Sequence, residues 1–269
     1  MRRRHRHVRD LAEKVRRLVD IQPETDIVSL GLRSADSVAI LGTDRHALSL
    51  ATCERGETLE MADAAMMRPV ATYSLVHGAW HGGWAWDLVR AELEARGHVV
   101  HTPDLPCEDV TATLDDYAAA VSPADVVVGH SLSGFVIPLV DARLHVFVCG
   151  LLGGLDWDEV FVPGFGDARV RDELGRSYYR DPADAAQDLQ YPPEQAHLAT
   201  RLRRQAPLDG REIPVARGVY IVCARDACIR PDWQRRAPYR QAEIDAGHSP
   251  MLECPAVLAD VLEREGRLA

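Results

Sequence analysis

The chain has 269 residues, which suits one large domain or a medium domain accompanied by a small one. Hydrophobic residues make up 46% of the chain, an ordinary share for a globular protein with a core. The formal net charge of −10 excludes a general attraction to nucleic acid or to an anionic membrane. No apolar run approaches the ~20 residues that span a bilayer. The basic first seventeen residues are interpreted as a solvated terminus.

The six cysteines form no CxxC pair and no grouping with histidine at zinc spacing. Cys149 and Cys223 stand inside apolar runs that are typical of strands. We therefore expect reduced, buried thiols in a cytoplasmic protein, and no metal site. No signal peptide is expected, because charged residues interrupt the segment that follows the basic start.

The first part of the chain shows no alternation of strand and helix. Helical patterns occur at residues 8–20 and 54–66, so residues 1–69 are expected to form a small helical region. Arg68 and Pro69 end the second pattern immediately before an apolar, strand-like run. We therefore place a domain boundary there, with a second domain over residues 70–269.

From residue 71 onward, short apolar runs alternate with helical patterns. Strands are expected at 71–78, 98–106, 124–130, 144–152, 218–225 and 239–246, and helices at 84–97, 111–121, 132–142 and 257–268. This alternation predicts an α/β fold, with a mostly parallel sheet of about six strands and helices on both faces. Residues 153–213 contain helical patches and no convincing strand, which indicates a helical lid.

The third of these strands ends in GHSLSG at residues 129–134, where a helix is expected to begin at once. This strand–turn–helix pattern is a nucleophile elbow, with Ser133 where glycine is usual. A tight turn exposes the serine hydroxyl and requires small neighbours. We therefore assign Ser131 as the nucleophile and interpret His130 as a packing residue. The helix start should also direct backbone N–H groups at a developing oxyanion.

Two other loops complete a catalytic site for this serine. HGAWHGGWAW at residues 77–86 follows the first strand, and we assign the oxyanion hole to the amides of Ala79 and Leu132. His248 stands between the last strand and the last helix, where it can act as the general base.

The acid that orients the base has two candidate positions. Asp226 follows the strand at residues 218–225, which gives the hydrolase order of serine, acid and histidine, and we assign the acid there. Asp156 and Asp158 follow an earlier strand, where some hydrolases keep the acid.

Four motifs now stand in order along the chain: HGAWHGGWAW, GHSLSG, RDACI and DAGHSPM. Over about residues 72–267 they resemble the α/β-hydrolases grouped with plant methylesterases and hydroxynitrile lyases, and most closely their bacterial esterase-like relatives. The resemblance implies hydrolysis of small ester or acyl substrates without a metal or an organic cofactor. Ser249 stands where the lyases of the group carry lysine, which argues against lyase chemistry. Dehalogenases and epoxide hydrolases need aspartate at the elbow, so Ser131 excludes them.

The N-terminal region carries a second resemblance. SLGLRS at residues 29–34 is similar to the motif of acyl or peptidyl carrier domains. The resemblance implies a phosphopantetheine arm on Ser34, with acyl-carrier or biosynthetic enzymes as partners. Arg33 stands where the family has aspartate, so we expect little or no modification. The alternative is a helical appendage without an arm.

The leading interpretation is a serine carboxylesterase or thioesterase that acts on a small ester or acyl substrate through an acyl-enzyme. The alternative from another class is a non-catalytic hydrolase-like protein that binds a ligand or a partner. A serine, a base, an acid and an oxyanion loop in the correct order favour the enzyme.

Overall fold

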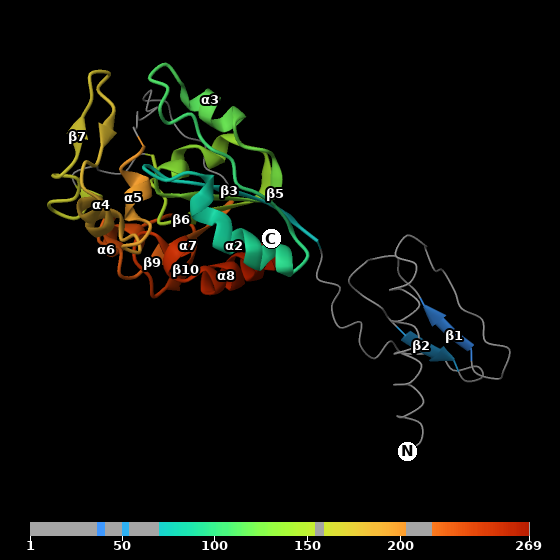
Figure 1. Cartoon of the computed structure of the whole chain (residues 1–269). Helices are drawn as coiled ribbons and strands as arrows, with labels where there is room; N and C mark the ends of the chain where they lie inside the picture. The colour runs from blue at the N-terminus through green and yellow to red at the C-terminus, as the bar shows by residue number, and fades with distance from the viewer. Residues whose placement is uncertain (1–36, 41–49, 54–69, 154–158, 203–216, 269) are drawn as a thin grey trace. The chain divides into compact units, whose positions relative to one another are not determined.

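A computed structural model describes residues 37–40, 50–53, 70–153, 159–202 and 217–268 (Figure 1). The chain divides into two compact units, Met1–Pro69 and Val70–Ala269. In the first unit the described residues are β1 (Ser37–Ile40) and β2 (Leu50–Cys53), which pair antiparallel. Each unit is described by itself.

This pair of strands was not predicted from the sequence. A carrier-type second helix beginning after Ser34 would cover residues 37–40, where the chain forms β1. The short apolar segments SVAI and LATC contain β-branched residues, which favour a strand. Ser34, the basic terminus and both expected helices lie outside the described residues.

The second unit is built on a six-stranded sheet in the order β10-β9-β6-β5-β3-β4, and every neighbouring pair is parallel. The strands are β3 (Thr72–Val76), β4 (Val99–His101), β5 (Ala124–His130), β6 (Ala142–Val148), β9 (Gly218–Cys223) and β10 (Arg240–Ile244). This confirms the predicted α/β class and the six predicted strands. β5 matches its predicted bounds, whereas β4 stops before Pro103, which has no N–H for the ladder.

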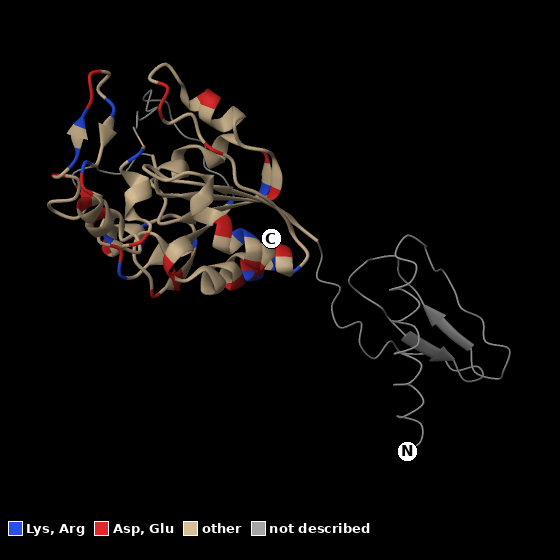
Figure 2. Ribbon diagram, viewed as in Figure 1, with Lys and Arg blue, Asp and Glu red and all other residues tan. Residues whose placement is uncertain are grey.

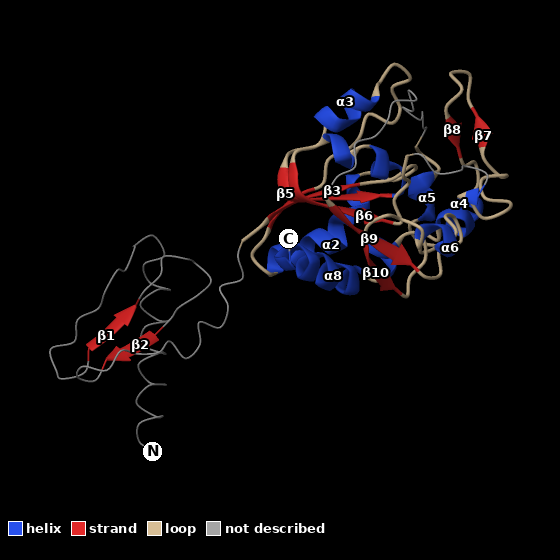
Figure 3. Ribbon diagram, turned by 180° about the vertical axis from the view of Figure 1, so that it is seen from behind, coloured by secondary structure: helices blue, strands red, loops and turns tan. Residues whose placement is uncertain are grey.

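Helices cover both faces of this sheet (Figures 1 and 3). On one face lie η1 (Gly83–Trp86), α2 (Asp87–Ala95), α7 (Pro250–Glu253) and α8 (Pro255–Leu268), with α2 beside α8. The other face is covered by α3 (Leu114–Ala119) and by the segment after β5. α2 is followed by Gly97 at φ 90°, the left-handed helix terminator that the sequence predicted.

The segment after β5 differs from the single helix predicted at residues 132–142. It forms two short 3-10 helices, η2 (Ser131–Phe135) and η3 (Ile137–Leu139), and β6 begins at Ala142. Pro138 lies within η3 and cannot donate the hydrogen bond that a continuous α-helix would need. The elbow therefore offers the N–H groups of one short turn, without the macrodipole of a long helix.

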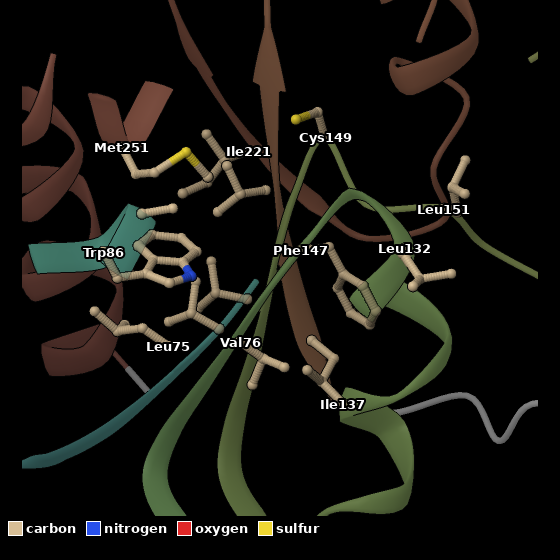
Figure 4. Close-up of a cluster of buried hydrophobic side chains, with 14 of the residues drawn as sticks. Leu75, Val76, Trp86, Leu132, Ile137, Phe147, Cys149, Leu151, Ile221 and Met251 are labelled. Carbon is tan, nitrogen blue, oxygen red and sulfur yellow. The ribbon is translucent and has the colours of Figure 1, made fainter. Parts of the chain in front are cut away.

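The hydrophobic core fills both sides of the sheet (Figure 4). Trp86 and Met251 lie on the side of α7 and η1, whereas Leu132, Ile137 and Phe147 lie on the side of η2 and η3. All five side chains are buried. The loops at the carboxyl ends of the strands thus start from a rigid base on both faces.

The lid region runs between β6 and β9. Its helices are α4 (Pro182–Leu189) and α5 (Ala196–Ala199), which fall within the predicted helical patches. It also holds a hairpin of β7 (Val170–Arg171) and β8 (Ser177–Tyr178) that was not predicted, since two-residue strands are too short for an alternating pattern. The Asp181 side chain accepts a hydrogen bond from the Ala183 amide and so caps α4.

Charged residues are distributed around this unit (Figure 2). Acidic and basic residues both occur along α2 and α8, while the middle of the sheet is almost without them. Among the described residues, no helix is long and apolar enough to cross a membrane.

Candidate active site

Ser131 occupies the turn between β5 and η2, and its backbone is left-handed with φ 51°. For a residue other than glycine this conformation costs about 1 kcal/mol, and such strain is typical of functional sites. A Cβ on Gly134 would lie 2.1 Å from the carbonyl oxygen of Leu151, and one on Gly129 would lie 2.9 Å from that of Ser133. The tight turn therefore requires glycine at positions 129 and 134.

The side chain of Ser133 makes a contact that glycine, the usual residue at this position, could not make. Its hydroxyl is fully buried and donates a short hydrogen bond to the backbone carbonyl of His77. This bond joins the elbow to the loop that follows β3. The departure from the usual motif thus adds a link between the two loops that would hold an oxyanion.

The loop after β3 passes directly beside the nucleophile. A Cβ on Gly78 would lie 2.9 Å from Cβ of Ser131, so only glycine allows this approach. The next residue is Ala79, whose carbonyl accepts a hydrogen bond from His81 Nδ1 at 2.7 Å. Leu132 is the second residue of η2, where a helical N–H has no partner within the helix. The residue before Ala79 thus lies against Ser131, and Leu132 follows Ser131 in the chain, as the assigned oxyanion hole requires.

His248 and Asp226 are in direct contact. His248 Nδ1 lies 2.9 Å from Asp226 Oδ2, and both side chains are almost fully buried. The backbone carbonyl of His248 accepts a hydrogen bond from His130 Nε2 at 2.8 Å, and His130 directly precedes Ser131. The three sequence-predicted triad residues are thereby brought to one end of the sheet, on the loops after β5, β9 and β10.

The Asp226 carboxylate accepts four N–H groups. Oδ1 accepts from the amides of Cys228 at 2.7 Å and Ile229 at 2.9 Å, while Oδ2 accepts from His248 and from Gln234 Nε2 at 2.8 Å. All four donors fix the direction of the carboxylate. A carboxylate fixed in this way holds the histidine tautomer that keeps Nε2 free to accept a proton.

Gln234 is a residue that sequence reasoning missed. It is fully buried at the end of α6 (Pro231–Gln234), and Nε2 donates to Asp226 and also to the Ile229 carbonyl. Its Oε1 accepts from the Cys223 amide at 2.9 Å. No local pattern marks it, because its partners come together only when β9 ends beside α6.

Three further histidines surround the pair, and all are buried. Burial lowers the pKa of His77 and of His130, and it lowers that of His81 to about 3. His130 lies with its ring centroid 4.8 Å from that of His248 and 4.8 Å from that of His81. These imidazoles are therefore neutral at neutral pH and supply hydrogen bonds without adding positive charge beside His248.

Two groups near the triad have the spacing of metal ligands. The donor atoms of Asp226, Cys228 and His248 lie within 4.8 Å of one another, as do those of His130, Cys149 and His248. The Asp226 oxygens and His248 Nδ1 are already engaged with each other and with N–H donors. Burial raises the pKa of Cys149 and Cys228, which keeps both thiols protonated. The set therefore fits proton transfer better than a metal centre.

The structure describes one of four other residues named in the sequence analysis. Asp156 and Asp158, the alternative positions for the acid, lie outside the described residues, as does Ser34. Ser249, at the position where lyases carry lysine, donates its hydroxyl proton to the Leu189 carbonyl at 2.6 Å.

Comparison with known proteins agrees with this fold. Residues 75–261 match the model of the Alpha/beta hydrolase family, so the chain belongs to that family. Methylesterase 9 of Arabidopsis thaliana is 30% identical over 250 residues, which cover 71% of this chain and 96% of the relative. Methylesterase 3 of the same plant is 27% identical over 248 residues, covering 70% and 93%.

Solved structures show the same fold. The pyrethroid hydrolase from Sphingobium faniae JZ-2 superposes with a TM-score of 0.55 at 21% sequence identity, covering 74% of this chain and 98% of that one. The predicted relationship to plant methylesterases is thus confirmed, and the chain is a serine-dependent hydrolase of the esterase type.

Proposed function

We propose that this protein hydrolyses a small-molecule carboxylic ester through an acyl-enzyme on Ser131, with His248 as the general base and Asp226 as its orienting acid. The observation that carries the proposal is the buried His248–Asp226 contact of 2.9 Å beside the strained Ser131 turn. The names of the relatives make methyl esters the first substrates to test.

The proposed reaction has two halves. His248 Nε2 takes the proton of Ser131 as Oγ attacks the ester carbonyl carbon, and the amides of Ala79 and Leu132 stabilise the oxyanion. The tetrahedral intermediate collapses, the C–O bond to the alcohol breaks, and the alcohol leaves with the proton from His248. His248 then takes a proton from water as the water oxygen attacks the acyl carbon. The bond from that carbon to Ser131 Oγ breaks, Oγ regains the proton from His248, and the carboxylic acid leaves. No step needs a metal or an organic cofactor.

The decisive test is labelling of the intact chain with a fluorophosphonate, together with hydrolysis of p-nitrophenyl esters of graded length. We expect the wild-type protein to be labelled and Ser131→Ala to remain unlabelled but folded. The kcat of Ser131→Ala should be lower by about 10³-fold or more, because only the oxyanion hole and substrate binding remain to promote the reaction. Labelling that persists in Ser131→Ala would move the nucleophile elsewhere. A wild-type protein that neither reacts nor hydrolyses esters would favour the alternative of a non-catalytic ligand-binding protein.

A thioester of an acyl carrier is the second substrate class. It is favoured by the SLGLRS motif, which would place a phosphopantetheine arm on Ser34. The strand at Ser37–Ile40 speaks against it, because a carrier domain has a helix after this serine. We therefore expect no mass increase when the chain is incubated with coenzyme A and a phosphopantetheinyl transferase. An increase of one arm that disappears in Ser34→Ala would reverse this preference.

The cysteines support a cytoplasmic location. Cys107, Cys149, Cys223, Cys228 and Cys254 are all free, and all but Cys254 are buried. Free thiols are typical of a reducing compartment. Fractionation of cells that express the tagged protein tests this proposal.

A further inference from the structure

The end of lid helix α4 contains an unusual residue. Gln190 follows Leu189 with φ 51° and ψ 45°, the left-handed conformation in which glycine is common and glutamine is rare. The next residue, Tyr191, continues into the lid. A side chain that remains at such a position is expected to have a role that glycine could not fill.

The side chain of Gln190 joins two catalytic loops. Its Oε1 accepts from the backbone amide of His248 at 2.7 Å and from that of Ala227 at 2.8 Å. Its Nε2 donates to the carbonyl of Arg225 at 3.1 Å. One amide group thus bonds to the residue assigned as the base and to both neighbours of Asp226.

The backbone next to His248 packs closely against the Gln190 side chain. A Cβ on Gly247 would lie 2.7 Å from Cδ of Gln190, so the amide lies against the backbone immediately before His248. On the other side of His248, the Ser249 hydroxyl donates to the carbonyl of Leu189. The two lid residues therefore hold the chain on both sides of the base.

The same segment also contacts the oxyanion loop. The Tyr191 hydroxyl donates to the carbonyl of Trp80 at 2.7 Å, and its ring lies 4.7 Å from that of His81 between centroids. Trp80 directly follows Ala79. Residues 189–191 are thus hydrogen-bonded to the loop of the base His248, to the loop of the acid Asp226 and to the loop that carries the Ala79 amide.

We propose that Gln190 is a positioning residue, through which the lid sets the location of the His248 backbone relative to Asp226. The inference rests on the proposed function, since it assigns a support to the proposed acid–base pair. The fixed Nδ1–Oδ2 contact gives the ring its direction, and the Gln190 amide fixes the backbone from which the ring projects. Small displacements of a base reduce proton transfer without weakening substrate binding.

The test compares Gln190→Gly with Gln187→Ala in the full chain. Glycine removes the amide but accepts the left-handed conformation, so the variant should fold, with a Tm a few degrees below that of the wild type from the lost hydrogen bonds. Gln187 is an exposed glutamine on the same helix, which makes it a matched control. We expect kcat to fall about 10- to 100-fold in Gln190→Gly, with KM within about 3-fold, and no change in the control.

A third variant separates positioning from simple stability. Gln190→Glu keeps an acceptor for the His248 and Ala227 amides, loses the donor to the Arg225 carbonyl, and adds a negative charge that favours the imidazolium. The pH at which kcat/KM reaches half its plateau should therefore rise by about half a unit, with kcat at high pH closer to wild type than in Gln190→Gly. The added charge moves this midpoint in either case, so kcat decides: a merely structural role would lower Tm and leave kcat of the folded protein at the wild-type value in both Gln190 variants.

An NMR measurement that does not depend on catalysis separates failure of the positioning role from failure of the proposed function. The proton between His248 and Asp226 is expected to give a low-field NMR resonance that is sharp in the wild type and in Gln187→Ala, and broadened or lost in Gln190→Gly. If Ser131→Ala retains full activity, the proposed function fails, while the resonance still decides the positioning role. If Ser131→Ala is inactive but Gln190→Gly matches the control in kcat and in the resonance, the positioning role alone is wrong.

Discussion

Asp226 accepts hydrogen bonds from two backbone amides, one glutamine and one histidine, and every one of these partners presents an N–H. A carboxylate can accept all four, because it has two acceptor oxygens and no proton to donate. An asparagine has one acceptor oxygen, so its NH₂ group must face N–H donors. The environment is therefore specific for aspartate at this position.

Asp226→Asn should consequently be far more damaging than the same change at the alternative position, Asp156→Asn. The amide would force the wrong tautomer on His248 or break the contact, and kcat should fall by about 10⁴-fold. Asp156→Asn should remain near the wild type. Steady-state kinetics on a p-nitrophenyl ester decide between them. If the Asp156 variant is the inactive one, the acid follows the earlier strand.

At the scale of secondary-structure elements, the sequence predicted what depends on local pattern. Buried parallel strands are continuous apolar runs, so β5 was predicted to the residue, and the lid helix α4 lies in the segment where helical patches were predicted. The elements that differed did so for two reasons. η2 and η3 replace one helix because of Pro138, and β7–β8 is too short to show a period.

The site divides in the same way. The serine, the base and the acid were assigned from motifs and chain order, because the carboxyl ends of parallel strands meet at one edge of the sheet. Gln190 and Gln234 were not found. The partners of Gln190 lie 35 to 58 residues away along the chain, and those of Gln234, 5 to 11 residues away, become neighbours only when α6 packs beside the end of β9. Glutamine in a charged segment looks like any solvated residue.

The elbow should tolerate no side chain at Gly134. In Gly134→Ala the new Cβ would lie 2.1 Å from a backbone carbonyl in the loop after β6, which cannot move without breaking the turn. We expect a loss of several kcal/mol in the free energy of unfolding, since overpacking against backbone is severe. Gly97→Ala is the matched control, because its Cβ would meet nothing within 4 Å although φ is 90°.

That control isolates backbone strain from steric clash. Gly97→Ala should cost about 1–2 kcal/mol from its left-handed conformation and leave kcat unchanged. Chemical denaturation and ester hydrolysis measure both variants. Equal losses of stability in the two proteins would contradict the role assigned to the close approach at residue 134.

For the molecule as a whole, one buried carboxylate ties the C-terminal helix to the rest. Glu263 on α8 accepts from Arg267 at 2.6 Å and from Arg96, just after α2, at 3.2 Å. His98 Nε2 lies 3.4 Å from it. Desolvation raises the pKa of Glu263, but the hydrogen bonds from Arg267, His98 and Arg96 outweigh it and lower the value from 4.5 to about 2.

The loss of stability at acid pH should reflect the protonation of Glu263. A pKa that is depressed in the folded state contributes stability that is fully present above about pH 4.5 and lost as the pH falls toward 2. Glu263→Gln should lower the free energy of unfolding at neutral pH by about 1–3 kcal/mol, because Arg267 and His98 lose their buried carboxylate while Arg96 keeps its two other carboxylate partners. The variant should also lose less stability than the wild type between pH 4.5 and pH 2.

Glu92→Gln is the control for this helix contact. Its carboxylate pairs with Arg96 at 3.4 Å but is 42% exposed, and exposed pairs contribute little. Its stability should remain within about 0.5 kcal/mol of the wild type. Urea unfolding at several pH values measures all three proteins, and a Glu263 variant with the wild-type pH dependence would contradict the assignment.

The bonds made by residues 189–191 also determine where this enzyme can be recombined with its relatives. Residues 170–188 carry the hairpin and all of α4 but its last residue, and exchanging them would keep the backbone bonds of residues 160 and 162 to the loop after Asp226. A junction placed after residue 191 would replace Leu189, Gln190 and Tyr191 and so remove the bonds to both sides of His248 and to Trp80. Chimeras joined before Leu189 should keep a kcat close to that of the wild type. Those joined after Tyr191 should fold normally but have a lower kcat.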